Sequence, residues 1–261
     1  MLKLLYVLLS ECAESTLRNF RKLAAKSTPV DPKIMNDLKV DGVSVQEDFL
    51  TSQQCDEYIA KIEKIIASGS SNIWKDSAGA DNRIYFAETL DDKFAEFFET
   101  PKIRQILSRY TGTEKPKGML LASRITAKEG NLGSGGGWHR DSPISHQFKA
   151  VCYLSDVTAN NGPFQFIKSS HTKFAVLKAY FNKLLKVGSN RFTDLEIEKY
   201  CSEEEKEVVS FTAKKGSIIF ADTKGIHRGK PLTEGKRYVL FCYFWHNEIP
   251  DHFNSLKQEE A

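Results

Sequence analysis

The chain has 261 residues, of which 41% are hydrophobic and 27% charged, and its formal net charge is +3. A charged fraction of this size together with 17 Phe and 9 Tyr excludes a disordered chain. No run approaches the ~20 apolar residues of a membrane-spanning helix, and the small net charge gives no reason to expect a nucleic-acid partner.

The five cysteines stand at positions 12, 55, 152, 201 and 242, an odd number with no C-x-x-C pair. This pattern indicates neither a disulfide framework nor a zinc knuckle, and it favours a reducing compartment. A secretory signal is not indicated, because no A-x-A cleavage site follows the apolar start MLKLLYVLL. The expected location is cytoplasmic.

Apolar residues recur near helical spacing through the first 23 residues, with basic residues among them. We expect an N-terminal helix within residues 1–30 that packs on the domain. The same pattern also allows peripheral contact of residues 1–25 with a membrane surface, or contact with a second copy of the chain. The oligomeric state stays open.

The next stretch predicts one short strand and three helices. Residues 42–46 are typical of a strand, and Thr51 is placed to cap a helix whose apolar residues continue to Ile66. Two further helices are expected over 91–98 and 103–110.

From residue 118 onward, short apolar or alternating runs are separated by turn residues, as in all-β domains. Eight strands are expected, at 119–127, 138–141, 149–155, 163–168, 207–211, 217–221, 225–228 and 237–245. A helical insertion at 173–204 interrupts them and is a candidate lid. The pattern predicts a single domain over 1–261, a mainly β sandwich or open barrel buttressed by N-terminal helices.

The stretch most informative about chemistry is GGGWHRD, which contains His139 and Asp141. Side chains alternate across a strand, so these two would point to one face and Arg140 to the other. An imidazole beside a carboxylate can hold a metal ion, although an isolated H-x-D is more often a structural ion pair. The preceding glycines predict a loop at a cavity entrance rather than a nucleotide-binding loop, since no Lys-Ser/Thr pair follows them.

A second histidine and an arginine follow in the C-terminal half. His227 lies in GIHRG, and Arg237 lies in GKRYVLFCYF after the polar turn KPLTEG. If the strands on either side of this turn pair with each other, the two side chains become neighbours on one face. Two imidazoles and a carboxylate suit Fe(II) and leave positions open for a chelating ligand, while arginine binds a carboxylate through two parallel donors. Together they describe a site for iron and a dicarboxylic 2-oxo acid.

In these blocks the sequence resembles the phytanoyl-CoA dioxygenase-like family of Fe(II)/2-oxoglutarate-dependent oxygenases. The resemblance covers residues 40–247, the expected catalytic region, and rests on WHRD, DVTANNGPFQFIKSSH, KKGSIIFADTKGIHRG and GKR in that order. It implies a double-stranded β-helix core, which is a jelly-roll or cupin-like fold. It also implies that His139, Asp141 and His227 hold Fe(II) and that Arg237 binds the distal carboxylate of 2-oxoglutarate.

The resemblance implies further candidates. Thr126 falls where ectoine-hydroxylase-like relatives contact 2-oxoglutarate, with a plain β-forming threonine as the alternative. Arg124, on the same strand face, would look into the cavity as a substrate contact, or would form a structural ion pair. His146 would touch substrate at the cavity mouth, or be a solvated loop histidine. Gly229 stands where relatives commonly carry a hydroxyl residue, which leaves the pose of 2-oxoglutarate open.

The implied activity is an O2-dependent conversion of 2-oxoglutarate to succinate and carbon dioxide that hydroxylates an unactivated C–H bond of a small-molecule substrate. Desaturation or ring formation at the same metal site, and a non-catalytic binding or sensor protein, are the alternatives. Halogenation is disfavoured because Asp141 is intact. Alkylated-base repair is disfavoured because Tyr243 stands where such relatives have a second arginine. The sequence does not identify the substrate.

Overall fold

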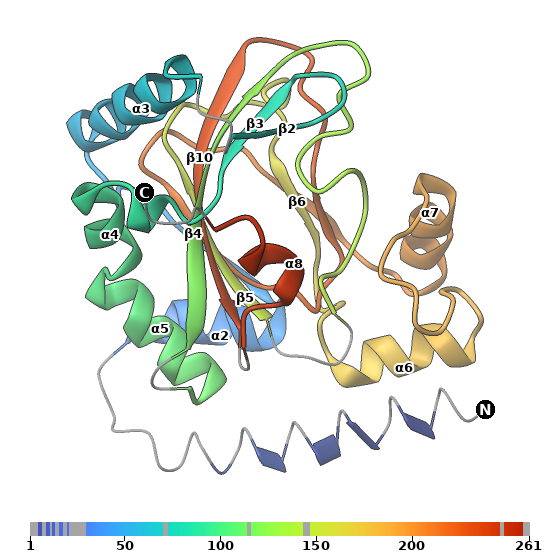
Figure 1. Ribbon diagram of the computed structural model, residues 1–261. Helices are drawn as coiled ribbons and strands as arrows, with labels where there is room; N and C mark the ends of the chain where they lie inside the picture. Colours follow the sequence, from blue (N-terminus) through green and yellow to red (C-terminus); the bar gives the residue numbers. More distant parts are fainter. Residues whose placement is uncertain are drawn as a thin grey trace.

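The computed structural model describes residues 30–69, 73–113, 116–142, 147–245 and 248–257, together with residues 5–6, 9–10, 12–13, 16–17 and 20. Within them, two antiparallel sheets enclose an apolar core, and helices cover the outer face of the larger sheet (Figure 1). The larger sheet runs, in spatial order, β1 (Val43–Gln46), β8 (Ile218–Asp222), β5 (Gln147–Tyr153), β10 (Lys236–Trp245), β4 (Lys117–Thr126), β3 (Asp81–Ile84) and β2 (Ile73–Lys75). The smaller sheet runs β7 (Val208–Phe211), β6 (Phe164–Ile167) and β9 (His227–Gly229).

The central strand β10 shows why the strands of the large sheet are apolar throughout. Side chains alternate across a strand: Val239 and Phe241 belong to the core between the sheets, whereas Leu240 and Cys242 belong to the core under the helices. Both faces of the sheet are therefore buried, and the pocket that contains the candidate site opens in the first core. The predicted mainly β architecture with flanking helices is confirmed.

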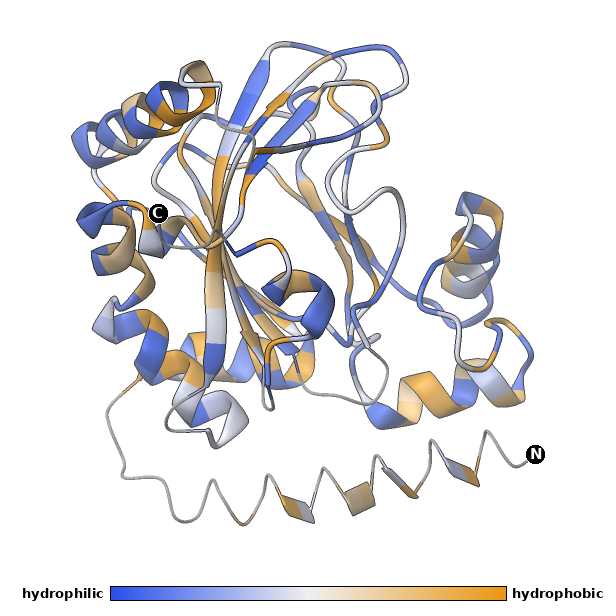
Figure 2. Cartoon of the chain, in the orientation of Figure 1, coloured by the Kyte–Doolittle hydropathy of each residue, from blue (hydrophilic) through white to orange (hydrophobic). Residues whose placement is uncertain are grey.

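Helices of the N-terminal half pack on the outer face of the large sheet. They are α2 (Pro32–Val40), α3 (Ser52–Ala67), α4 (Asp92–Phe98) and α5 (Pro101–Thr111), with the 3-10 turn η1 (Ala87–Thr89) between β3 and α4. The predicted cap of α3 is present: Thr51 Oγ1 accepts a hydrogen bond from Gln54 N at 3.2 Å, and Gln54 Oε1 accepts one from Thr51 N at 2.9 Å. Figure 2 shows hydrophilic and hydrophobic stretches side by side on α3, as expected of a helix with one buried face.

The insertion at 173–204 contains two helices, α6 (Lys173–Phe181) and α7 (Asp194–Glu203). Both lie on the side of the molecule away from α3–α5 (Figure 1). They bury a separate apolar cluster that includes Trp138 and Ile226, each one residue before a histidine of interest. The insertion is thus packed directly behind the candidate metal ligands. A last helix, α8 (Asp251–Asn254), follows β10.

Two expectations about the strands need correction. Strand β9 pairs with β6, not with β10, so His227 and Arg237 lie in different sheets. Residues 138–141 form no extended strand: only His139 makes isolated bridges, to His227 and Arg191. The strand and turn patterns correctly located these segments but could not say which sheet each one joins.

The N-terminal helix was expected to pack on the domain, and the described positions contradict this. Leu5, Tyr6 and Leu9 are helical, but they are 53%, 66% and 62% exposed. The rest of that prediction falls largely outside the described residues. Helix α2 and strands β2 and β3 were not predicted at all. No helix in the described parts of the chain has the length and apolar character needed to cross a bilayer.

Candidate metal and cosubstrate site

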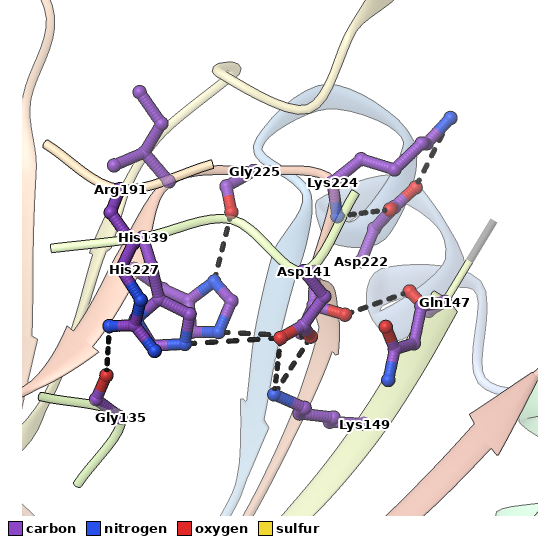
Figure 3. Close-up of polar contacts among 12 residues, drawn as sticks. Gly135, His139, Asp141, Gln147, Lys149, Arg191, Asp222, Lys224, Gly225 and His227 are labelled. Atoms are coloured by element: carbon purple, nitrogen blue, oxygen red, sulfur yellow. Dashed lines mark hydrogen bonds and ion pairs between the residues drawn. The ribbon is translucent and has the colours of Figure 1, made fainter. Parts of the chain in front are cut away.

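Three predicted ligands come together at one end of the core between the sheets. His139 and Asp141 lie in the connection between β4 and β5, and His227 is the first residue of β9. The backbones of the two histidines are bonded to each other, with N···O distances of 2.9 and 2.8 Å. One ligand atom from each of the three residues lies within 4.8 Å of those of the other two. Figure 3 shows the imidazoles and the carboxylate pointing toward one another.

The two imidazoles are held in the same way. Nδ1 of His139 lies 2.9 Å from the carbonyl oxygen of Gly137, and Nδ1 of His227 lies 2.9 Å from that of Gly225. A carbonyl only accepts, so each Nδ1 carries the proton, and each Nε2 presents a lone pair toward Asp141. Nε2 of His139 lies 3.9 Å from the Asp141 carboxylate, and Nε2 of His227 lies 4.0 Å from it. Fixing one ring nitrogen in this way is typical of metal-binding histidines.

The electrostatics of the triad favour the deprotonated forms that bind metal. Burial lowers the pKa of His139 to about 4 and that of His227 well below its ordinary value. Burial works against ionisation of Asp141, but the adjacent ammonium of Lys149 outweighs it and lowers the pKa of this carboxyl. Near neutral pH the site offers two neutral imidazoles and one carboxylate, which is the protonation state that a divalent metal requires.

Lys149 is a member of the site that the sequence reading missed. Its ammonium lies 2.7 Å from Oδ2 and 3.0 Å from Oδ1 of Asp141, and 4.4 Å from the ring centre of Tyr243. The side chain is 5% exposed, on the strand β5. The signal was available, because a lysine within the otherwise apolar run FKAVCYL is costly to bury without an anionic partner.

Arg237 lies in the same pocket as the two histidines. An inner pocket of about 550 Å³ between the sheets is lined by both imidazoles, Arg237 and apolar side chains that include Tyr153 and Phe164. Arg237 is 2% exposed, and within the described part of the chain no carboxylate forms an ion pair with it. Burial lowers the pKa of Arg237. A buried guanidinium of this kind calls for an anionic partner from outside the chain.

The glycine-rich loop supplies the hydrogen-bond partner that Arg237 does have. Nη2 of Arg237 donates to Oγ of Ser134 at 2.9 Å. Ser134 occupies the space beside Gly229: a Cβ added to that glycine would lie 2.8 Å from Cβ of Ser134. A hydroxyl therefore does stand at this end of the pocket, but it comes from the loop before His139 rather than from residue 229. Gly135 is needed for the same close approach, since its Cβ would lie 2.2 Å from the His139 ring.

Two of the predicted cavity residues lie on the wrong face of β4. The cavity side of this strand is that of Leu121, whereas Arg124 points to the helix layer and forms an ion pair with Glu63 of α3 at 2.8 Å. The prediction that Arg124 looks into the cavity is wrong, and its structural alternative is what the geometry shows. Thr126 shares the face of Arg124 and does not line the pocket, so the structure does not bring it to the site. His146 lies outside the described residues.

The fold and the site define a class of protein. The structure has the same fold as double-stranded β-helix enzymes solved with iron or 2-oxoglutarate, and the likeness at these low sequence identities is one of fold. One is the epimerase SnoN in complex with Fe³⁺, α-ketoglutarate and nogalamycin RO, with 19% identity, a TM-score of 0.61, and 82% of each chain covered. Another is HygX from Streptomyces hygroscopicus with nickel and 2-oxoglutarate, with 14% identity, a TM-score of 0.59, and 83% of this chain and 87% of that chain covered. EctD from S. alaskensis with bound Fe has 14% identity and a TM-score of 0.64, over 85% of this chain and 78% of that chain.

The family follows from the sequence as a whole. The family model described as phytanoyl-CoA dioxygenase (PhyH) matches residues 38–239. The chain belongs to this family of Fe/2-oxoglutarate-dependent oxygenases, as the motifs indicated. No curated protein matches the chain.

Proposed function

We propose that this protein is an Fe(II)- and 2-oxoglutarate-dependent dioxygenase that hydroxylates an unactivated C–H bond of a small-molecule substrate. His139, Asp141 and His227 would hold the iron, and Arg237 would bind the distal carboxylate of 2-oxoglutarate. When bound, the iron would supply the O2 chemistry that couples decarboxylation of 2-oxoglutarate to oxidation of the substrate.

One observation carries the proposal: the inner pocket is lined by a histidine ring nitrogen and a guanidinium nitrogen that are buried and have no hydrogen-bond partner. Among the described residues, Nε2 of His227 and Nε of Arg237 have no hydrogen-bond partner. Unsatisfied buried groups are rare in folded proteins and call for an explanation. A metal ion at the triad and a carboxylate at Arg237 would satisfy both groups, and a dicarboxylic 2-oxo acid is the kind of molecule that reaches from one to the other.

The chain's own side chains divide the remaining work. The carbonyls of Gly137 and Gly225 hold the two Nδ1–H groups, which keeps both Nε2 atoms available. Lys149 holds the carboxylate of Asp141 in place. The aromatic rings of Phe164 and Tyr153 line the pocket and limit the access of water.

Ser134 is proposed as a second residue for the distal carboxylate. Its oxygen accepts from Arg237, so its own proton is directed to another acceptor. A carboxylate bound at Arg237 would therefore be a suitable acceptor for this proton. Ser134 would thus provide the hydrogen bond that Gly229 cannot.

A second candidate reaction uses the same site for desaturation or ring formation. Solved structures with this fold include one described as an epimerase and one as a carbocyclase, so the fold alone does not choose the outcome. A non-catalytic binding or sensor protein is less well supported, since all three metal ligands and Arg237 are in place. The five free cysteines agree with a cytoplasmic location, which we propose on that basis.

Succinate formation tests the function. Purified protein with Fe(II), 2-oxoglutarate and O2 is expected to produce succinate, and His139→Ala is expected to produce none above background. With a substrate present, product mass separates the outcomes: one added oxygen atom indicates hydroxylation, and the loss of two hydrogens indicates desaturation or ring formation. A wild-type protein that forms no succinate while correctly folded would contradict the proposal.

A further inference from the structure

A second cavity lies beside the triad and has no role in holding the cosubstrate. It is open, with a volume of about 960 Å³. It shares Arg83, His139, Lys149 and Tyr243 with the inner pocket but does not include Arg237. Its walls come from the ends of β3, β5 and β10, from α8 with the segment before it, and from the insertion at residues 190–191. Because Asp141 also lines it, a molecule in this cavity would lie next to the metal site.

One wall of this outer cavity is a continuous set of aromatic rings. Tyr243 stacks on Trp245 with ring centres 5.8 Å apart, and Phe253 of α8 lies 5.3 Å from Trp245 and 6.1 Å from Tyr85. Such rings provide flat apolar surface for the body of a ligand.

The charges on the opposite wall are unequal. Arg83 is paired with the buried Asp81 at 2.6 Å, and Lys149 is paired with Asp141 at 2.7 Å, so neither is an unopposed cation. Asp141 is the only acidic side chain among the described lining residues, and it is already engaged. Arg140 also lines the cavity but is 1% exposed, so the exposed cation at the mouth is Arg191.

Arg191 belongs to the insertion and reaches back over the glycine-rich loop. Its Nη1 donates to the carbonyl oxygens of Gly135 at 2.7 Å and Gly136 at 3.3 Å, and Figure 3 shows it beside His139. Both acceptors are neutral, and within the described parts of the chain no carboxylate pairs with this guanidinium. Its charge is uncompensated, and the donors other than Nη1 are not used by these bonds.

We propose that the outer cavity is the substrate site and that it takes an anionic substrate, a carboxylate or phosphate ester with a flat apolar body. The anionic group pairs with Arg191, and the body lies on the aromatic wall formed by Tyr243, Trp245 and Phe253. This inference rests on the proposed function and names its substrate class. Its basis is the charge and shape of a cavity that the metal and the cosubstrate leave free.

The test compares acids with their uncharged counterparts. The probes are 3-phenylpropanoate and octanoate, each against its primary amide, with phenyl phosphate added to separate phosphate from carboxylate recognition. Binding is measured by calorimetry on protein loaded with Ni(II) and 2-oxoglutarate, which gives affinities without turnover. We expect at least one acid or phosphate to bind about tenfold tighter than its neutral counterpart, the size of a hydrogen bond to a charged group.

Two variants make the test specific. Arg191→Gln keeps a donor for the carbonyl of Gly135 but removes the charge. Acids and amides should then bind this variant with about equal affinity, and the affinity for the amides should be that of the wild type. Lys199→Gln removes an exposed charge from α7 of the same insertion and should leave the preference unchanged. Equal binding of acids and amides, no binding of any probe, or a preference that survives in Arg191→Gln would overturn the proposal. Failure of the proposed function is a separate result, since it appears as absent succinate formation without any probe.

Discussion

The two cavities that meet at the triad are built in different ways. The inner pocket is formed largely by strands of both sheets, and its Arg237 is buried and bonded to the glycine-rich loop. The outer cavity is assembled from strand ends, a short C-terminal helix and the insertion, and its unopposed cation is exposed. The difference indicates that the rigid part of the fold is committed to the metal and the cosubstrate, while connecting segments decide which substrate is accepted.

The largest effect should come from removing the carboxylate of the metal triad, next to which both cavities lie. Asp141→Ala leaves two imidazoles without their carboxylate and Lys149 without its partner, so we expect iron binding to weaken at least ~100-fold, since even outer-shell changes reach this size. Equilibrium dialysis with Fe(II) under anaerobic conditions measures it. Asp156→Asn, at an exposed carboxylate, is the control and should bind iron normally. Unchanged iron binding in Asp141→Ala would show that the triad does not hold the iron.

The next largest effect should be confined to the inner pocket. Arg237→Met removes the buried guanidinium, and losing one partner of a buried charge pair costs about 2–5 kcal/mol, so 2-oxoglutarate should bind at least ~30-fold more weakly. Pyruvate, which chelates through the same 2-oxo acid group but has no distal carboxylate, should bind as it does to the wild type. Anaerobic titration of the Fe(II) complex by visible absorption gives both affinities. An equal loss for both ligands would mean that Arg237 supports the pocket rather than the carboxylate.

Ser134 allows a finer test of the same pocket. Ser134→Ala should weaken 2-oxoglutarate binding about tenfold, as expected for one hydrogen bond to a charged group, with no change for pyruvate. Transferring the hydroxyl gives a matched control. Gly229→Ser alone should be destabilised, because its Cβ would lie 2.8 Å from Cβ and 3.0 Å from the backbone nitrogen of Ser134. Ser134→Gly removes the closer of these contacts, so the double variant should recover part of the affinity. A double variant no better than Ser134→Ala would show that the hydroxyl at this place does not matter.

The sequence could predict those parts of the site whose residues lie close together in the chain. His139 and Asp141 are two residues apart, and the block around His227 carries its own pattern, so local motifs and the family resemblance they carry were enough to indicate the triad and Arg237. Ser134 could not be found in that way, because its role depends on a loop that approaches Gly229, a contact between segments far apart in the chain. Lys149 was detectable as a lysine in an apolar strand, and it was overlooked.

The errors about β4 and β9 have a common physical origin. Alternation along a strand tells which side chains share a face, but not which face is inward when both sides of the sheet are covered. Arg124 and Thr126 were therefore assigned together to the cavity and together lie on the helix side. Similarly, a polar turn between two strands does not show whether they pair or cross to opposite sheets, as β9 and β10 do. Helix α2 could have been found, since Asp31 before Pro32 is a typical helix start.

The smallest effect concerns a residue that belongs to neither cavity. Burial raises the pKa of Glu88 on η1 to about 7 from an ordinary 4.5, although its carboxylate accepts a hydrogen bond from Leu120 N at 2.8 Å. Between these values the folded protein keeps a proton that the unfolded chain releases. The protonated Glu88 therefore contributes fully to the free energy of unfolding below pH 4.5. This contribution is lost as the pH rises through about 7.

Glu88→Gln should remove this part of the pH dependence, an effect on the order of 1 kcal/mol. Urea unfolding of both proteins on either side of this window measures it. Affinity for 2-oxoglutarate should not change, since Glu88 lines neither cavity. A wild-type stability that rises with pH across the window relative to the variant would show that the sign is wrong.

The central claim is that the triad and Arg237 form one site for iron and 2-oxoglutarate, and anaerobic visible spectroscopy tests it most directly. Adding 2-oxoglutarate to the protein with Fe(II) should produce a metal-to-ligand charge-transfer band that saturates at one equivalent. The band should be absent in Asp141→Ala, and in Arg237→Met it should appear only at higher 2-oxoglutarate concentrations. A folded wild-type protein that binds no iron, or binds it without a band dependent on 2-oxoglutarate, would contradict the claim.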